Sequence, residues 1–374
     1  MLLIASVHWG IEMRLAAGQS GKPLRVEENM KTKITELFGI QYPIILSGMS
    51  WISVPKMVAA VSNAGGLGIL ATGPLSVEET RAAVRKIRQL TDKPFGANCS
   101  LMFPGAAANA KVLLEEKVPV INFALGKGDW IAKKAHEYGG KVVATVVNAR
   151  HAKRAQDYGC DAVIATGNEA AAHGEAITTM VLIPSLMDVL KIPVIAAGGI
   201  ADGRGLAAAL ALGAEGVAMG TRLMTTQESP LHDTYKKLSI EKDVTDTLYS
   251  KRFDGIWCRV MKTDAAERAI KRGLNIPASF ANSKEITRQL NLPFTRVLAG
   301  VLASGYKNAI QMAYLANAFK MIRIATEEGD LNEGVLPVGQ VTGLIHDVPT
   351  VKEVIERVVS EAKQVQQGLA QKLS

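Results

Sequence analysis

The chain has 374 residues, of which 48% are hydrophobic, 21% are charged and 5% are aromatic. This composition excludes a disordered chain, because the apolar surface is large enough to offset the entropy that folding costs. The net charge is +8, but basic residues alternate with acids, as in "VRKIRQLTDK", and aromatic residues are sparse. We therefore expect a small anionic ligand and no nucleic acid.

Residues 1–29 begin with a short apolar run that no basic segment precedes, so they fit a secretory signal poorly. We expect an N-terminal extension that is poorly ordered or loosely docked. A convincing domain start follows at Met30, with "KTKITELFGIQYPII".

Short apolar runs alternate with segments of helical spacing between residues 42 and 221, which indicates parallel strands joined by helices. The predicted strands are 42–48, 67–72, 95–101, 118–125, 141–147, 161–167, 193–199 and 215–221. They are apolar nearly throughout, as expected when both faces of a sheet are covered. We predict an α/β fold, a (β/α)8 TIM barrel over residues 30–227. The alternative is a doubly wound open sheet, although no Gly-x-Gly-x-x-Gly follows the first strand.

Helical spacing is clear at 54–65, 77–90 and 203–213, where Asp202 is a plausible N-cap and Gly213 a plausible C-terminal stop. Residues 228–330 carry few strand signals and several helical ones, so we predict a mostly helical lid or substrate lobe inserted after strand eight. Residues 331–374 are expected to return to the barrel through a last helix that starts near Thr350.

The three cysteines, Cys99, Cys160 and Cys258, are widely spaced and form neither a disulfide framework nor a CxxC metal pair. We therefore predict no metal site and a reducing, cytoplasmic location. No apolar run has the length of a membrane span, so no membrane partner is expected. A homo-oligomer is compatible with the sequence, which fixes no oligomeric state.

Glycines follow two neighbouring strands at the edge where a barrel binds its ligand. Strand seven ends at Gly198 and Gly199, and strand eight ends at Gly220 and Thr221. Backbone N–H groups can approach an anion closely there, and these two loops commonly hold a phosphate. The alternative is that the glycines only make tight turns.

Strands one and three also carry unusual residues. Strand one ends at Gly48 and Met49, which suit a flat ring system, and strand three carries Asn98, whose amide can bond the edge of a heterocycle. The alternatives are a core methionine and an asparagine that satisfies nearby backbone.

Strand six ends at Gly167 and leads to Glu169 and His173. A phosphate pocket, a flat-ring pocket and one histidine together indicate an FMN barrel in which His173 handles a proton. His173 could instead be a structural histidine.

The remaining histidines are weaker candidates. His136 and His151 lie in helical surface patterns, and His346 lies in the linker to the last helix. His232 follows a proline in the second lobe and stays a minor candidate because it is close to the end of strand eight.

Several motifs resemble those of the nitronate monooxygenase family over residues 31–365. They are "YPIILSGMSW", "SNAGGLGIL", "TDKPFGAN", "GNEAAAHGE", "IPVIAAGGIADGRGLAAALALGAEGVAMGTR" and "GVLPVGQVTGLIHDVPTV". The resemblance implies a TIM barrel with a helical lid and a tightly bound FMN.

Matching positions imply roles for single residues. Gly48 and Met49 are expected against the flavin ring, Asn98 at its edge, and Gln340 reaching it from the C-terminal segment. The phosphate positions are Gly198, Gly199, Gly220 and Thr221. His173 matches the active-site histidine of the family, and Glu169 is expected to anchor its loop.

The resemblance favours oxidation of alkyl nitronates with O2. The alternative within the family is an NAD(P)H-dependent reduction of quinones or enoyl thioesters, and a non-flavin phosphate-binding barrel is an alternative from another class. Two departures leave the substrate open: Ala170–Ala172 stand where the family usually has glycines, and Leu46 and Ser47 stand where many members have Gln and Gly.

Overall fold

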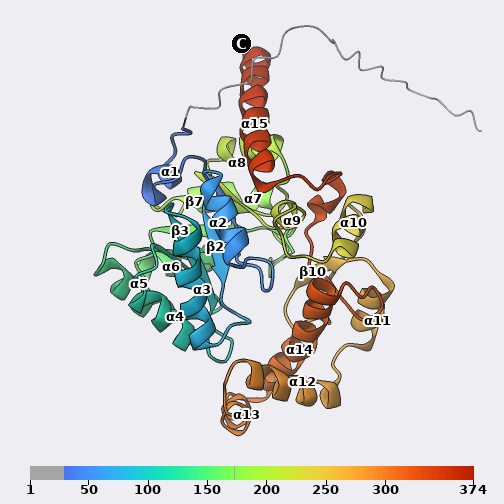
Figure 1. Cartoon of the computed structure of the whole chain (residues 1–374). Coiled ribbons are helices and arrows are strands. Elements are labelled where there is room, and N and C mark those ends of the chain that lie inside the picture. The colour runs from blue at the N-terminus through green and yellow to red at the C-terminus, as the bar shows by residue number, and fades with distance from the viewer. Residues whose placement is uncertain (1–28, 172) are drawn as a thin grey trace, which may run out of the picture.

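The computed structural model describes residues 29–171 and 173–374. Most of the predicted N-terminal extension, residues 1–28, lies outside the described residues, as does Ala172. Over the described residues, eight parallel strands form a barrel that helices surround, and a second lobe lies beside it (Figure 1). The predicted (β/α)8 TIM barrel with a lobe after strand eight is confirmed.

Each barrel strand falls inside the range predicted for it. The strands are Ile44–Leu46 (β1), Gly68–Ala71 (β2), Phe95–Ser100 (β3), Val120–Ala124 (β4), Lys141–Val146 (β5), Ala162–Thr166 (β6), Val194–Ala197 (β7) and Gly216–Met219 (β8). Their spatial order is β1-β8-β7-β6-β5-β4-β3-β2. A bridge between Ile45 and Leu67 joins the two ends of this order, so the sheet closes. Closure removes the exposed sheet edges that an open sheet would leave.

The helices of the barrel alternate with its strands along the chain. They are Lys33–Phe38 (α1), Pro55–Asn63 (α2), Val77–Leu90 (α3), Ala106–Glu115 (α4), Asp129–His136 (α5), Ala149–Asp157 (α6), Thr179–Met187 (α7), Gly203–Ala211 (α8) and Thr221–Met224 (α9). Their ends have local causes. Ser76 and Glu79 form a capping box at α3, Asp202 accepts the N–H groups that open α8, and Gly213 turns the chain after α8 with φ +98°.

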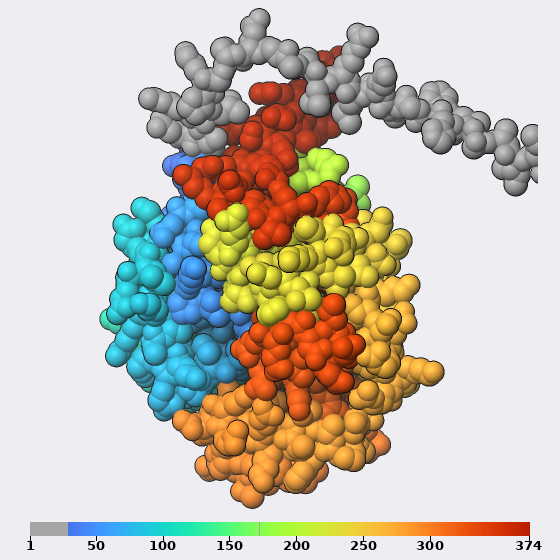
Figure 2. Space-filling model, turned by 45° about the vertical axis from the view of Figure 1, so that its right-hand side comes forward, coloured from blue at the N-terminus to red at the C-terminus, as the bar shows by residue number. Residues whose placement is uncertain are grey.

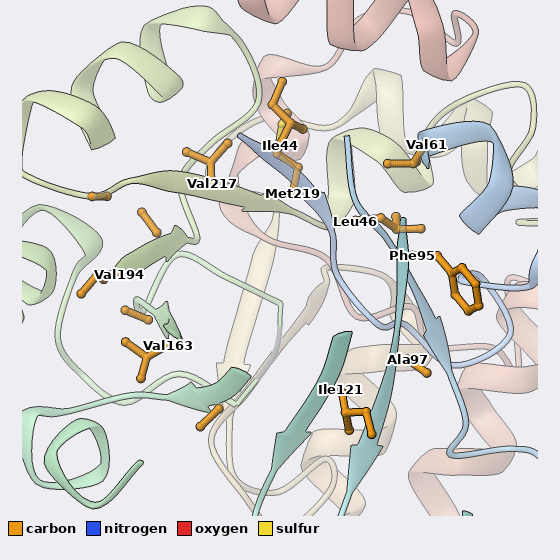
Figure 3. Packing of buried hydrophobic residues seen from close by; sticks show 14 of the residues in the cluster. Ile44, Leu46, Val61, Phe95, Ala97, Ile121, Val163, Val194, Val217 and Met219 are labelled. Atoms are coloured by element: carbon orange, nitrogen blue, oxygen red, sulfur yellow. The ribbon is translucent and has the colours of Figure 1, made fainter. Parts of the chain in front are cut away.

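Alternation along the strands builds two apolar layers. One layer packs between the sheet and the helices and includes Ile44, Leu46 and Val217, part of which Figure 3 shows. The other layer fills the barrel, where Ile34 and Phe38 of α1 pack against inward-facing strand residues. The barrel interior is therefore filled at the end where its strands begin.

The second lobe combines helices with one hairpin. Its elements are Asp233–Glu241 (α10), Thr247–Ser250 (β9), Cys258–Met261 (β10), Asp264–Arg272 (α11), Ile276–Gln289 (α12), Phe294–Ala303 (α13), Tyr306–Arg323 (α14) and a π-helix at Ile324–Glu328. The lobe is mostly helical, as predicted, but the antiparallel hairpin β9–β10 was not predicted. Its strands are short, and residues 251–257 separate them without the two-residue Asn-Gly type of turn that marks a hairpin.

The chain ends with a 3-10 helix at Gln340–Leu344 and the helix Val351–Leu373 (α15). Thr350 caps α15 in a capping box with Glu353, in agreement with the predicted start. The first half of α15 packs on α8, and its second half projects beyond the barrel (Figure 1). No helix in the described part of the chain is both long and apolar enough to cross a membrane.

The contact between α8 and α15 predicts the effect of a single methyl group. A Cβ at Gly203 would lie 2.3 Å from the backbone nitrogen of Ala362 and 2.3 Å from Cβ of Glu361. Gly203→Ala is therefore expected to lower the free energy of unfolding by about 1–3 kcal/mol, because α15 must shift. Gly368→Ala is the matched control, since nothing lies within 4 Å of its added Cβ. It should stabilise α15 by about 0.5–1 kcal/mol. Chemical denaturation measures both variants, and equal stability of Gly203→Ala and the native protein would contradict the expectation.

Candidate active site

A cavity of about 920 Å³ lies between the C-terminal ends of the barrel strands and the second lobe. Strand ends form one wall, and the loop between β9 and β10 forms the other together with α14. In Figure 2 the lobe, yellow to orange, lies directly against the barrel, blue to cyan. A second hollow of about 750 Å³ lies at the opposite end of the strands, near Phe38 and Lys141, and none of the predicted site residues lines it. The first cavity is therefore the candidate active site.

Most of the residues predicted for the site line this cavity. They are Gly48, Met49, Asn98, Glu169, His173, Gly198, Gly199, Gly220 and Thr221. Gly167 and Gln340 do not line it. A Cβ at Gly167 would lie 2.1 Å from Oγ1 of Thr179, so this glycine permits close packing behind the wall. Gln340 supports the wall through its backbone N–H, which donates to the carbonyl of Glu169 at 2.9 Å.

The ends of β7 and β8 present a concave backbone surface. Gly198 and Gly199 have φ of +101° and +75°, a conformation that other residues rarely adopt. At Gly220 an added Cβ would meet only Sδ of Met49 at 3.4 Å and Oγ of Ser47 at 3.9 Å, so it would project into the cavity. Glycine thus leaves space at the edge where barrels bind phosphate, and the residues present fit such a group.

A row of polar side chains crosses the strands below the cavity. The Asn98 amide donates to Oδ1 of Asn122 at 2.7 Å, and the Asn122 amide donates to Oγ1 of Thr145 at 3.1 Å. All three residues line the cavity. Asn122 and Thr145 were not predicted, although Asn122 interrupts the apolar run "VPVINFAL" as Asn98 interrupts its own.

Two bulky residues of the cavity wall have left-handed backbone. Trp51, in the loop between β1 and α2, has φ +61°, and Leu125, directly after β4, has φ +55°. Such residues are strained and persist only where packing holds them. The Trp51 ring packs edge-on against Phe319 of α14, with ring centroids 4.3 Å apart. The wall is therefore set partly by contact with the lobe.

The loop after β6 is tied to the barrel by Glu169. Its carboxylate accepts the backbone N–H of Thr179 at 2.9 Å and the Thr179 hydroxyl at 3.0 Å. Thr179 begins α7, so the carboxylate also meets the positive end of a helix. This arrangement agrees with the expected anchoring role of Glu169.

The same loop is tied to the second lobe by the hairpin. Arg259 of β10 donates to the carbonyl of Asn168 at 3.0 Å and to Oδ1 of Asn168 at 2.8 Å. The Tyr249 hydroxyl of β9 donates to the carbonyl of Gly174 at 2.8 Å. Arg259 is buried, and this burial lowers the pKa of its guanidinium. Its hydrogen bonds therefore offset a large desolvation cost.

Ala170 and Ala171, where the resemblance led us to expect glycines, are compatible with this loop. Among the residues with described backbone, neither Ala170 nor Ala171 has positive φ. The carbonyl of Ala171 accepts the N–H of Arg259 at 3.3 Å. At these two positions the loop does not need the conformational freedom of glycine.

His173 faces the cavity and meets a carboxylate of the lobe. Its Nε2 lies 2.6 Å from Oδ2 of Asp254, whose side chain is 5% exposed. Cys258 lies beside the pair, and ligand atoms of the three residues lie within 4.8 Å of one another. Nitrogen, oxygen and sulfur are the donors that zinc takes, but zinc needs a thiolate. Burial raises the pKa of Cys258 well above its usual value, so a metal bound there would have to release the thiol proton.

Among the other histidines discussed above, one lies in a different environment from the one predicted. His136 pairs with Asp161 at 2.9 Å, away from the cavity, and His232 caps α10. The exposed His346 does not line the cavity. His151 was predicted on a helical surface, but it lines the cavity mouth, because the N-terminal end of α6 follows β5 there.

Comparison with known proteins gives a consistent result. The family model described as nitronate monooxygenase matches residues 31–361. The "(3aS,4S,5R,7aS)-5-hydroxy-7a-methyl-1-oxo-octahydro-1H-indene-4-carboxyl-CoA dehydrogenase" of Rhodococcus jostii is 38% identical over 338 residues, which cover 89% of this chain and 96% of that protein. A "Probable nitronate monooxygenase" of Staphylococcus aureus is 31% identical over 60% of this chain and 76% of its own length. The structure of FabK from Thermotoga maritima is similar with a TM-score of 0.76 and 37% identity, over 92% of this chain and 100% of that one.

The bonds between hairpin and loop predict a local effect of substitution. Arg259→Met removes the side-chain donors that reach Asn168, and it should lower the free energy of unfolding by about 2–3 kcal/mol. Hydrogen exchange followed by mass spectrometry should show faster exchange over residues 168–175. Arg268→Met is the control, because its exposed side chain donates to Asn332 elsewhere in the lobe. Unchanged exchange over 168–175 in Arg259→Met would contradict the proposed tie.

Proposed function

This chain belongs to the nitronate monooxygenase family, and on that premise we propose that it is an FMN-dependent oxidoreductase that acts on acyl thioesters. The observation that carries the proposal is the composition of one cavity, which joins a glycine-lined phosphate edge, a histidine and a basic mouth. Its volume of about 920 Å³ is near the upper end for a ligand pocket, which suits a cofactor with an extended substrate.

The residues proposed to hold FMN line the cavity wall. Gly198, Gly199, Gly220 and Thr221 would hold the FMN phosphate through backbone groups at the ends of β7 and β8. Gly48 and Met49 would contact the flavin ring, and Asn98 would face its edge. When bound, FMN would supply the hydride chemistry.

The proposed acyl-thioester substrate is supported by the basic side chains that line the cavity. Lys127, His151 and Arg154 line the cavity on the barrel side. On the lobe side Lys251 lies over the ring of Trp257, with Nζ 5.2 Å from its centroid. Cations beside an exposed indole suit the phosphates and flat base of coenzyme A. The name of the Rhodococcus relative likewise specifies a CoA-linked substrate.

His173 is the group proposed to handle the proton. Oxidation of a substrate by loss of hydride releases a proton, and reduction by hydride takes one up. An imidazole at the cavity wall can accept or return it near neutral pH. We propose that the lobe of residues 228–330 acts as the lid that keeps water from this step.

A second candidate is oxidation of alkyl nitronates with O2. It is favoured by the family match over residues 31–361 and by the Staphylococcus relative. The basic mouth would attract an anionic nitronate as well.

In a reductive version of the proposed acyl-thioester function, NAD(P)H would be the electron donor. Three buried, unpaired cysteines support our proposal of a reducing, cytoplasmic location.

Anaerobic mixing tests the proposed function. The purified protein is expected to be yellow, and a hydroxyacyl-CoA should bleach its flavin absorbance because the substrate reduces the flavin. A nitronate tested in parallel should bleach it slowly or not at all. Bleaching by nitronate alone would replace the first candidate with the second, and a colourless protein that takes up no FMN would exclude both.

A variant tests the role of His173. His173→Ala should retain FMN but lower turnover by about a hundredfold or more, as is typical for loss of a general acid or base. His136→Ala is the control, because His136 also pairs with an aspartate but lies away from the cavity. Steady-state kinetics and flavin content measure both, and native turnover in His173→Ala would refute the role.

A further inference from the structure

We infer that Asp254 of the second lobe is the positioning residue for His173, and that its contact leaves Nδ1 as the ring nitrogen that exchanges the proton. The inference rests on the proposed function, because it assigns His173 a proton-transfer role. The sequence did not single out Asp254.

The contacts of Asp254 define the direction of each hydrogen bond. Its Oδ2 lies 2.6 Å from Nε2 of His173, and its Oδ1 accepts the N–H of Ile256 at 3.1 Å. A buried carboxylate needs donors on both oxygens, and an ionised carboxylate can only accept. The proton of the neutral imidazole therefore lies on Nε2, and the lone pair lies on Nδ1.

The position of His173 makes this tautomer useful. The side chain is 28% exposed and lines the cavity, and Nδ1 bonds to no group within the described residues. A substrate proton can therefore reach Nδ1, while Asp254 holds the opposite side of the ring and stabilises the imidazolium that forms. Aspartates paired with catalytic histidines orient the ring in the same way.

The location of Asp254 couples this pair to the lobe. Asp254 lies in residues 251–257, between the strands of the hairpin whose Arg259 and Tyr249 hold the His173 loop. Docking of one hairpin thus sets both the path of the loop and the orientation of the ring. The site is complete only when the lobe is in place.

The test uses Asp254→Asn, which keeps the shape of the side chain. The N–H of Ile256 should retain the amide oxygen, so the amide NH2 would face His173 and donate to Nε2. The ring proton would then move to Nδ1, and the cavity would lose its proton acceptor. We expect turnover to fall by about a hundredfold or more with little change in KM or FMN content.

Nitrogen-15 NMR of labelled histidine gives a readout that does not depend on turnover or on FMN. The native protein should show His173 protonated at Nε2, and Asp254→Asn should show it protonated at Nδ1, with His173→Ala identifying the signal. Asp161→Asn is the matched control, because it alters the same kind of contact at His136. It should leave both the His173 tautomer and turnover unchanged.

The outcomes separate the two proposals. Protonation of native His173 at Nδ1 would overturn the inference without any variant, and so would native turnover in Asp254→Asn with a changed tautomer. If the native protein turned over no acyl thioester, the proposed function would fail. The NMR comparison would still decide whether Asp254 sets the tautomer.

Discussion

The candidate site depends on the docking of the β9–β10 hairpin against the loop that follows β6. The buried guanidinium of Arg259 meets the carbonyl and side chain of Asn168, and Asp254 of the same hairpin meets His173. A buried charge without partners would cost far more than these hydrogen bonds contribute. The loop and the lobe therefore hold each other in place beside the cavity.

This mutual support explains how Ala170 and Ala171 can stand where the resemblance led us to expect glycines. Glycine is favoured where φ is positive, and neither Ala170 nor Ala171 has a positive φ. Contacts from the lobe, including the N–H of Arg259 on the carbonyl of Ala171, set the path of the loop instead. The loop is thus defined by tertiary hydrogen bonds and not by the backbone preferences of its own residues.

Local signals account for the part of the fold that could be predicted. The strand ranges, the helix Val77–Leu90 and the caps Asp202 and Thr350 each depend on residues a few positions apart. The hairpin was not predicted because its strands are short and their pairing joins residues across a loop. Asn122 was not predicted as a site residue, although it had a local signal, a polar side chain in an apolar strand.

The sequence by itself determined the barrel, the glycine-lined strand ends and the presence of a histidine after strand six. The signals for these features, which are the hydrophobic period, the turn residues and the succession of strands, can each be read from neighbouring positions along the chain. Only the tertiary structure decided which carboxylate faces that histidine. Asp254 lies 81 positions further along the chain than His173, and no period or spacing connects them. Only the packing of the lobe against the barrel brings their side chains together.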